Sequence, residues 1–571
     1  MSSSEITQLK VDDEPFLVAS LIDRCPKTMM LRELVQNAIE AATEAPAGKR
    51  RVEIGVVEVE GARKLRIWNT GPGMDEPNLY RMCDIASSIG KLKGLDRNFG
   101  MGAKVASLPS NHHGLRYRSC ANGLVHEMII GKRHGVYGRI MRPRSGAGRP
   151  GLDRMVDILE ISDLARREGY DLSQDWTEVA LLGMGPDHDT AAEPYNGDPE
   201  MGPFWLPEAL YGRFFRFPED IEVVIEPELT WRPAPQRFLT LAQRAKTAFA
   251  GYECVTTQEG LRIHYFHDPA TPGRAWENAS SEGALQTAMG QVGIVYREEI
   301  YDRTVGSPWA HEAPNFGVTF GGRHVSVFIE LPDDYPVRPD AYRMNLMKVS
   351  GDQSVIQALE FAQTVRKSRP RWFVETIEAM GGGAHNLSSA IQDLARLSGT
   401  LNLSALQPST DDDARVDDQD SEDENAPGYS IAEARAKCGF GIALLRDAQD
   451  INDRWLNGRA ACFYPSTKQL FVNTQYPSIE QAEAALRVRL SDMRDTGLLD
   501  EMIRNAAIDC VVVKVGRALL HAMAKHFDSE KWHSGHIEKA MSPETLSIVA
   551  DDLDDLLPVA ERKIRDEALM S

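Results

Sequence analysis

Apolar positions in the first 190 residues switch between helical and strand spacing. Segment 26–43 predicts a helix, because its apolar residues recur every three or four positions. These residues are Leu31, Leu34, Val35, Ala38, Ala41 and Ala42. Segments 51–60 and 64–68 alternate apolar and polar residues, which predicts two strands joined by a turn at Glu60–Ala62. Asp75 is positioned to cap the next helix.

The middle of the chain also mixes both kinds of spacing. Segment 183–207, rich in glycine and proline, predicts a boundary loop before a second domain at 208–400. Within that domain, a helical pattern covers 354–380 with an interruption near Pro370. Strand patterns are found at 220–227, 260–266, 291–302 and 324–332.

The last third of the chain differs from the rest. Segment 408–428 is acidic and poor in large apolar residues, so it predicts a disordered linker. Region 429–571 has mainly helical spacing, with one predicted hairpin at 459–465 and 469–474. Its long amphipathic helices would suit dimerisation or partner binding. The whole chain is therefore expected to be an α+β protein of several domains.

Composition narrows the class of protein. At 571 residues the chain is too long for one core. It has no apolar run of about eighteen residues and no signal-peptide pattern, so we expect no membrane span and a cytoplasmic location. Its seven cysteines include no CxxC pair, so we expect no structural zinc. The formal net charge of −20 opposes wholesale coating of nucleic acid, but permits a local basic face.

Glu33 and Asn37 stand four residues apart in the predicted helix 26–43, so they would share one face of it. A carboxylate there can accept a proton from an attacking water. An amide oxygen one turn later can bind Mg²⁺, which prefers oxygen ligands. Taken alone, the pair is equally compatible with the polar surface of an amphipathic helix.

Two glycine-rich segments follow. Segment 69–74 (NTGPGM) comes directly after a predicted strand, and its glycines allow the backbone to approach a flat ligand. Segment 98–104 (NFGMGAK) would open a helix, where backbone N–H groups favour phosphate. It is not a Walker A loop, because neither GKS nor GKT ends it. Each segment alone is also compatible with an ordinary turn.

The first motif (33–41), the second motif (69–74) and the third motif (98–104) occur in this order and are followed by Thr177 in the strand pattern 176–181. In this arrangement they resemble the motifs of the GHKL ATPase superfamily. This superfamily includes gyrase, the large heat-shock chaperone, histidine kinases and MutL, and the chain is most similar to its MORC-like and heat-shock-chaperone-like branches. The resemblance covers about 27–182. It implies a GHKL (Bergerat) α/β sandwich at 1–190, a transducer-like αβ domain at 208–400 and a mainly helical C-terminal domain.

The resemblance also implies roles and cofactors. Glu33 would be the general base, Asn37 would hold Mg²⁺ against ATP, and Asn69 would accept a hydrogen bond from adenine. Segment 87–97 would be a lid over the nucleotide. The residues implied to bind nucleotide are Asn37, Glu40, Ala41, Asn69, Gly71, Gly73, Met74, Ser88, Lys91, Gly100, Met101, Gly102, Ala103, Lys104 and Thr177.

The chain departs from the family pattern at four positions. Glu40 and Asn69 stand where the family has aspartate, whereas Arg97 and Trp176 stand where it has glycine. The change at Asn69 matters most, because a neutral amide accepts a weaker hydrogen bond than a carboxylate. An amide can also turn and donate to the O6 atom of guanine. Both ATP and GTP are therefore open as ligands.

Hydrolysis in this family usually needs a basic residue from the following domain. Arg343 and Lys348, after the strand pattern 324–332, are the candidates, and ordinary surface charge is the alternative. Segment 131–154 is rich in arginine, which fits either a nucleic-acid contact or a solvated face.

The leading functional expectation is a Mg²⁺-dependent, slow ATPase that changes conformation as a homodimer and acts as a clamp on DNA or on a protein partner. A protein-remodelling chaperone and a nucleotide sensor with little turnover are the alternatives. A histidine kinase is disfavoured, because no phospho-acceptor helix precedes the site.

Overall fold

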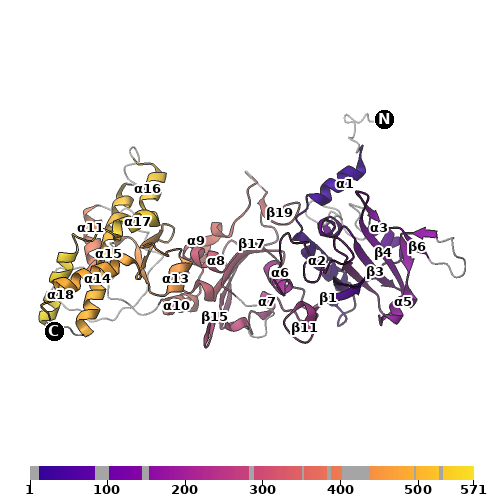
Figure 1. Ribbon diagram of the computed structural model, residues 1–571, viewed down its shortest axis with the longest axis horizontal. Coiled ribbons are helices and arrows are strands. Elements are labelled where there is room, and N and C mark those ends of the chain that lie inside the picture. Colours follow the sequence, from indigo (N-terminus) through magenta and orange to yellow (C-terminus); the bar gives the residue numbers. More distant parts are fainter. Residues whose placement is uncertain are drawn as a thin grey trace.

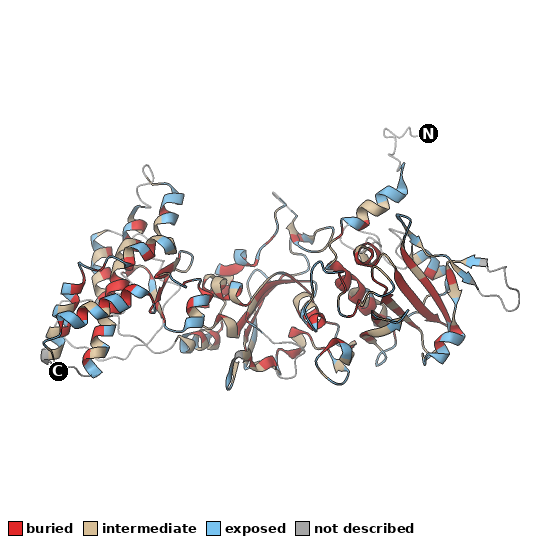
Figure 2. Cartoon of the chain, viewed as in Figure 1, coloured by how far each residue is buried: buried red, intermediate tan, exposed pale blue. Residues whose placement is uncertain are grey.

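Three regions of the chain lie in a row, with sheets at the N-terminal end and helices at the C-terminal end (Figure 1). The computed structural model describes residues 12–83, 102–144, 154–281, 289–349, 353–381, 388–401, 438–493, 497–525 and 532–570. Buried residues follow the strands and the inner faces of the C-terminal helices (Figure 2). The protein is therefore of mixed α+β class.

The first region is built on a nine-stranded sheet. Along the sheet the strands are β11 (Gln236–Arg237), β10 (Glu222–Ile225), β1 (Arg51–Val59), β2 (Ala62–Thr70), β9 (Trp176–Leu181), β3 (Leu115–Ala121), β4 (Leu124–Arg133) and β5 (Val136–Arg139), with β8 (Ile158–Glu160) also on β4. Only β1 and β10 pair in parallel. A short ribbon of β6 (Arg142–Arg144) and β7 (Arg154–Val156) lies beyond it.

Helix α2 (Met29–Thr43) packs on one face of this sheet, where Val35 and Ile39 join Ile54 and Ile67 in the core. The predicted helix is confirmed, although it begins three residues later than expected. The two strands are also confirmed, and Asp75 caps the next helix by accepting from the N–H of Asn78 at 2.9 Å. The other helices here are α1 (Glu14–Asp23), α3 (Glu76–Met82), α4 (Gly102–Ser107), α5 (Ser162–Arg167) and α6 (Trp205–Arg213).

A buried lysine fixes the predicted boundary loop. Lys64 is fully buried, and its ammonium donates to the carbonyl oxygens of four loop residues. These are Leu182, Gly185, Pro186 and His188, at 3.0, 3.3, 2.9 and 2.6 Å. An ammonium group has three hydrogens to donate, so the Lys64 ammonium shares them among these four carbonyl oxygens. The loop is therefore held against the first region rather than left free.

The second region contains a five-stranded sheet in the order β12 (Gly251–Thr256), β13 (Arg262–His267), β18 (Val325–Glu330), β16 (Gln291–Tyr296) and β17 (Glu299–Val305). The strand patterns 260–266 and 324–332 are confirmed as β13 and β18. The pattern 291–302 is not one strand but the antiparallel pair β16 and β17, and the pattern 220–227 forms β10 of the first sheet. The small ribbons are β14 (Ala270–Thr271) with β15 (Arg274–Asn278), and β19 (Val337–Pro339) with β20 (Leu346–Lys348). The helices are α7 (Leu241–Arg244), α8 (Ser307–Glu312), α9 (Ala362–Lys367) and α10 (Arg371–Met380).

The predicted helix 354–380 forms only in part. It consists of α9 and α10, with Ser368–Pro370 between them. Pro370 lacks a backbone N–H and its ring would clash with the preceding turn, so the helix restarts after it. Residues 354–357 are not helical, and Ala358–Phe361 form a 3₁₀ turn.

The third region is mainly helical. Its helices are α11 (Ser388–Thr400), α13 (Ala448–Asp453), α14 (Pro477–Arg489), α15 (Gly497–Lys525), α16 (Ser534–Ala540), α17 (Pro543–Ala550) and α18 (Leu557–Met570). The predicted hairpin is confirmed as β22 (Ala461–Tyr464) and β23 (Gln469–Asn473), while β21 (Gly441–Leu445), parallel to β23, was not predicted. The predicted linker 408–428 lies outside the described residues.

Helix α11 joins the third region although it precedes the acidic segment in sequence. Leu394 of α11 lies against Gly516 of α15, so closely that a Cβ at Gly516 would be 2.6 Å from it. Over the described ranges, none of the helices is both long enough and apolar enough to cross a membrane.

Buried polar contacts connect the third region to the second. Arg323 donates twice to Asp453 of α13, and both bonds measure 2.7 Å. The adjacent Arg454 is buried and donates to the carbonyl oxygens of Ala310 and Thr319, the latter at 2.7 Å. Trp455 stacks on His311 with a centroid separation of 3.8 Å.

Candidate functional site

Glu33 lies on the buried side of α2 beside the third motif. Glu33 is 8% exposed, and its Oε1 atom accepts a hydrogen bond from Nη1 of Arg32 at 2.5 Å. A Cβ at Gly102, the first residue of α4, would collide with Oε2 of Glu33. Only glycine therefore lets the start of α4 come this close to the carboxylate.

Gly71 and Gly73 of the second motif pack closely between two neighbouring elements, α2 and β3. A Cβ at Gly71 would collide with the carbonyl oxygen of Ala41 in α2, and its φ of 139° also favours glycine. A Cβ at Gly73 would collide with the carbonyl oxygen of Cys120 in β3. The turn therefore brings the end of β2 into contact with both the first-motif helix and a strand that carries no motif.

Three polar side chains form a row across the helix-facing side of the sheet. Asn69 of β2 is opposite Thr177 of β9, which is opposite Ser119 of β3. The Ser119 and Thr177 hydroxyl oxygens are 2.8 Å apart, and Ser119 Oγ also accepts from the N–H of Met74 at 2.7 Å. Ser119 Oγ also lies 3.1 Å from the carbonyl oxygen of Trp176, to which it donates, so the row is held in place by bonds within the protein. We expect the oxygen atoms of this row to face the polar edge of a flat ligand.

Ser119 was not found by sequence reasoning. It lies in the fully buried stretch 115–121 and belongs to none of the motifs. Its place beside Thr177 depends on the pairing of β3 with β9, which nothing in the local pattern specifies.

The side chain of Asn69 has a defined orientation. Asn69 is 6% exposed, and its Nδ2 donates to the carbonyl oxygen of Thr70 at 2.9 Å. With the nitrogen engaged in this way, Oδ1 is the atom that can accept from a ligand.

The other residues predicted to bind nucleotide differ in their burial and in their contacts. Asn37 is exposed one turn after Glu33, and its amide makes no hydrogen bond to the described part of the chain. Glu40 accepts from Gln36 at 3.1 Å. Lys104 is buried and donates to the Met82 carbonyl oxygen, while Ala103 packs against the first core. The remaining predicted residues, Ser88, Lys91, Gly100 and Met101, lie outside the described residues, as does the proposed lid.

Glu299 of β17 connects the second region to this site through two arginines of the first region. Arg32 donates to both carboxylate oxygens of Glu299, with Nε at 3.0 Å from Oε2, and Arg213 donates to Oε2 as well. Burial alone would raise the pKa of the Glu299 carboxyl, but the guanidinium groups of Arg213 and Arg32 outweigh burial and hold that pKa at about 2. Glu299 is therefore a fixed negative charge between the two regions.

The two predicted basic residues are placed differently. Arg343 lies between β19 and β20, and its carbonyl oxygen accepts from Nη2 of Arg213 at 2.8 Å. The adjacent Tyr342 packs against the core of the first region. Lys348 instead pairs with Glu360 of its own region at 2.8 Å. The fold thus brings Arg343, but not Lys348, to the junction beside Glu299.

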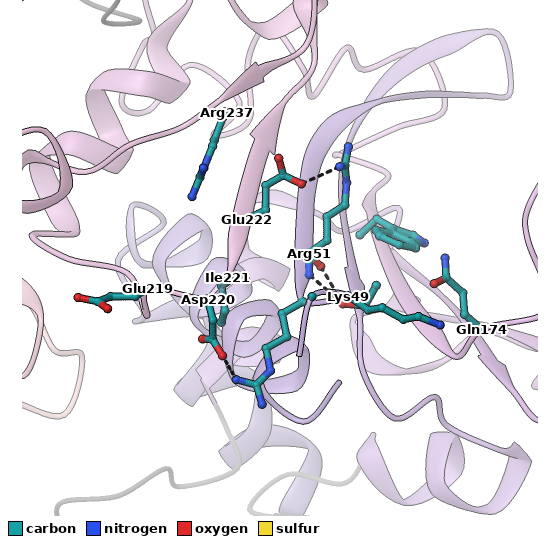
Figure 3. A pocket seen from close by; sticks show the side chains of 12 residues that line it. Lys49, Arg51, Gln174, Glu219, Asp220, Ile221, Glu222 and Arg237 are labelled. Atoms are coloured by element: carbon teal, nitrogen blue, oxygen red, sulfur yellow. Dashed lines mark hydrogen bonds and ion pairs between the residues drawn. The ribbon is translucent and has the colours of Figure 1, made fainter. Parts of the chain in front are cut away.

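A separate hollow of about 420 Å³ lies on the other face of the first sheet (Figure 3). Trp68 and Thr70 line it, and they alternate along β2 with Ile67 and Asn69, which face α2. Two of its cations are already paired, Arg50 with Asp220 and Arg51 with Glu222 at 2.8 Å. Of the motif segments, only Thr70 lines this hollow, which lies on the sheet face away from Glu33 and Asn69.

Arginine side chains in the described part of the arginine-rich segment bond to groups of the protein itself. Arg139 pairs with Asp157 at 2.9 Å, and Arg142 pairs with the buried Glu127. Arg133 donates to backbone carbonyl oxygens. These contacts favour a structural role for the three side chains over binding to phosphate.

Within the described ranges, no cluster of three or more His, Cys, Asp or Glu side chains could hold a metal ion. A Mg²⁺ ion held by Asn37 would need only one protein oxygen, because phosphates and water complete its shell. The amide of Asn37, exposed and without a hydrogen bond to any described residue, fits that demand. In comparisons with known proteins, no protein family and no curated protein matches the chain.

Proposed function

We propose that the first region binds ATP with Mg²⁺ and hydrolyses it slowly, and that the protein, as a homodimer, converts this cycle into a conformational change. The observation that carries the proposal is the meeting of motifs far apart in sequence. Glu33 contacts the start of α4 at Gly102, Gly71 packs on the first-motif helix, and Asn69 aligns with Thr177. These contacts gather the motifs around the helix that carries Glu33 and the sheet that carries Asn69.

The chemistry proposed for Glu33 follows from its surroundings. One oxygen of its carboxylate is held by Arg32, so the other is directed toward Gly102. That oxygen can accept the proton of a water that attacks the terminal phosphate. Mg²⁺, when bound, would offset the charge of the phosphates, and Asn37 is the residue that would hold it.

The polar row supports adenine as the base. The Oδ1 atom of Asn69 is oriented as an acceptor, which suits the amino group of adenine and not the O6 atom of guanine. The hydroxyl groups of Thr177 and Ser119 continue the row beside it. The amide orientation thus favours ATP over GTP, a choice that the residue type alone leaves open.

A second candidate function is a nucleotide sensor with little turnover. The observation that favours it is the contact of Arg32 with Glu33, because a carboxylate oxygen that accepts a guanidinium N–H is not free to accept a proton. Turnover would then depend on how strongly Arg32 is bound by its other partner, Glu299.

The partner on which the cycle acts is proposed to be a protein. A DNA clamp needs cations free to contact phosphate. In the described part of the arginine-rich segment, Arg133, Arg139 and Arg142 instead bond to groups of the protein itself. Turnover measured with and without DNA separates the two partner classes, since stimulation by DNA would reverse this choice.

Glu33→Ala tests the proposed hydrolysis. Loss of the base is expected to lower ATP turnover by about 10²-fold or more, while a non-hydrolysable ATP analogue still binds. Glu44→Ala is the matched control, because Glu44 is an exposed residue at the end of the same helix. If Glu33→Ala retains turnover within a few-fold of wild type, Glu33 is not the base.

A further inference from the structure

Glu299 is a buried carboxylate of the second region whose partners come from the first. The residue is 6% exposed, and its two oxygens accept from Arg32 of α2, with a further bond from Arg213 at the end of α6. Arg32 and Glu299 are 267 positions apart in sequence. The contact therefore exists only while the second sheet is docked on the first region.

Arg32 is shared between two carboxylates. Its Nε and Nη2 atoms bind Glu299, and its Nη1 atom donates to Oε1 of Glu33 at 2.5 Å. A guanidinium group is planar and rigid, so fixing two of its nitrogens also fixes the direction of the third. The position of Glu299 thereby decides where Arg32 can hold Glu33.

We infer that Glu299 is a positioning residue for Glu33: through Arg32 it makes the orientation of the proposed base depend on the docking of the second region. With Oε1 held, Oε2 of Glu33 faces Gly102, where the attack on phosphate is proposed. This inference rests on the proposed function and adds to it a route by which the second region controls hydrolysis.

The surroundings of Glu299 connect this route to the rest of the second region. Its backbone bridges to Phe214, directly after Arg213. Arg213 also donates to the carbonyl oxygen of Arg343, at the tip of the β19–β20 ribbon. A shift of the second sheet or of this ribbon would therefore alter the bonds to Glu299, and with them the plane of Arg32.

The test compares kinetics with binding in the full chain carrying Glu299→Gln. Glutamine keeps the shape of the side chain but loses the charge that holds the guanidinium group. We expect kcat to fall about tenfold, while KM and the Kd of a non-hydrolysable ATP analogue change by less than about twofold. Glu298→Gln is the matched control, because that carboxylate is 51% exposed and binds Arg216 instead.

Arg32 variants isolate the route. In an Arg32→Gln background, adding Glu299→Gln should change kcat by less than about twofold, because the connection is already cut. Arg32→Lys keeps the charge without the planar fork, and should lower kcat with unchanged Kd even if Glu299→Gln does not fold. An unchanged kcat in Glu299→Gln or in Arg32→Lys, or additive losses in the double variant, would overturn the inference. A wild-type chain that neither binds nor hydrolyses ATP would overturn the proposed function itself.

Discussion

The Asn69 side chain makes a hydrogen bond to the neighbouring backbone that an aspartate could not make, although an aspartate would accept a stronger hydrogen bond from a ligand. Its Nδ2 donates to the carbonyl oxygen of Thr70, which a carboxylate could not do. An aspartate there would place an oxygen against the Thr70 carbonyl, so two acceptors would face each other in a buried position. The amide avoids that repulsion and still presents Oδ1 to the polar row.

Asn69→Asp should therefore have two opposite effects. The free energy of unfolding of the nucleotide-free protein should fall by about 1–3 kcal/mol, because a buried carbonyl loses its donor. ATP should be favoured further over GTP, since a carboxylate accepts from adenine and repels the O6 atom of guanine. Chemical denaturation and the ratio of the two dissociation constants measure these effects.

Asn196→Asp is the control for that substitution, because Asn196 is exposed. Unchanged stability in Asn69→Asp would show that the amide does not bind Thr70. An unchanged ATP to GTP ratio would remove Asn69 from the base.

At the scale of elements, the turn at Gly71–Gly73 is a close-packed joint. The turn packs between α2 and β3, and backbone carbonyl oxygens of these two elements occupy the space that a side chain at Gly71 or Gly73 would need. Cores of this density do not yield without displacement of a helix or strand. The turn therefore sets the spacing between the helix that carries Glu33 and the sheet that carries Asn69.

Gly73→Ala should destabilise the protein by about 1–3 kcal/mol or more, because the added methyl group would collide with the Cys120 carbonyl oxygen. Gly138→Ala is a matched control in β5, where an added Cβ meets no atom within 4 Å. Chemical denaturation of both variants measures the difference. Equal effects at the two positions would mean that the joint yields without cost.

The elements that could be predicted from the sequence are those that local patterns determine. Helix α2, the β1–β2 hairpin and the cap at Asp75 depend on residues within a few positions of one another. Ser119 and Glu299 could not be found in this way, because each acquires its place from strand pairing or docking over long sequence distances. Parallel strand β21 was missed for the same reason.

At the scale of the whole molecule, two arginines join the third region to the second, one facing neutral partners and one facing a carboxylate. Arg454 carries its guanidinium into the second region, where it donates to two backbone carbonyl oxygens. Burial lowers the pKa of Arg454. The neighbouring pair of Arg323 and Asp453 is bidentate, a geometry that fixes direction as well as distance. The third region is thus fastened to the second in one orientation.

Arg454→Met should loosen this junction while leaving each core intact. Hydrogen bonds to a charged group contribute about 1.5–3 kcal/mol each, and both would be lost. Calorimetry should then resolve separate unfolding transitions for the second and third regions. Arg459→Met is the control, because the bonds of the Arg459 side chain to described residues go to Trp455 and Glu544, both in its own region. One cooperative transition in Arg454→Met would show that other contacts suffice.

The row of three regions has a mechanical consequence (Figure 1). Because Arg454 and the Arg323–Asp453 pair fasten the third region to the second, we expect these two regions to move as one unit. A rotation of that unit about the contact of Arg32 with Glu299 would move the far C-terminal helices more than any atom near Glu33, because they lie farther from the axis.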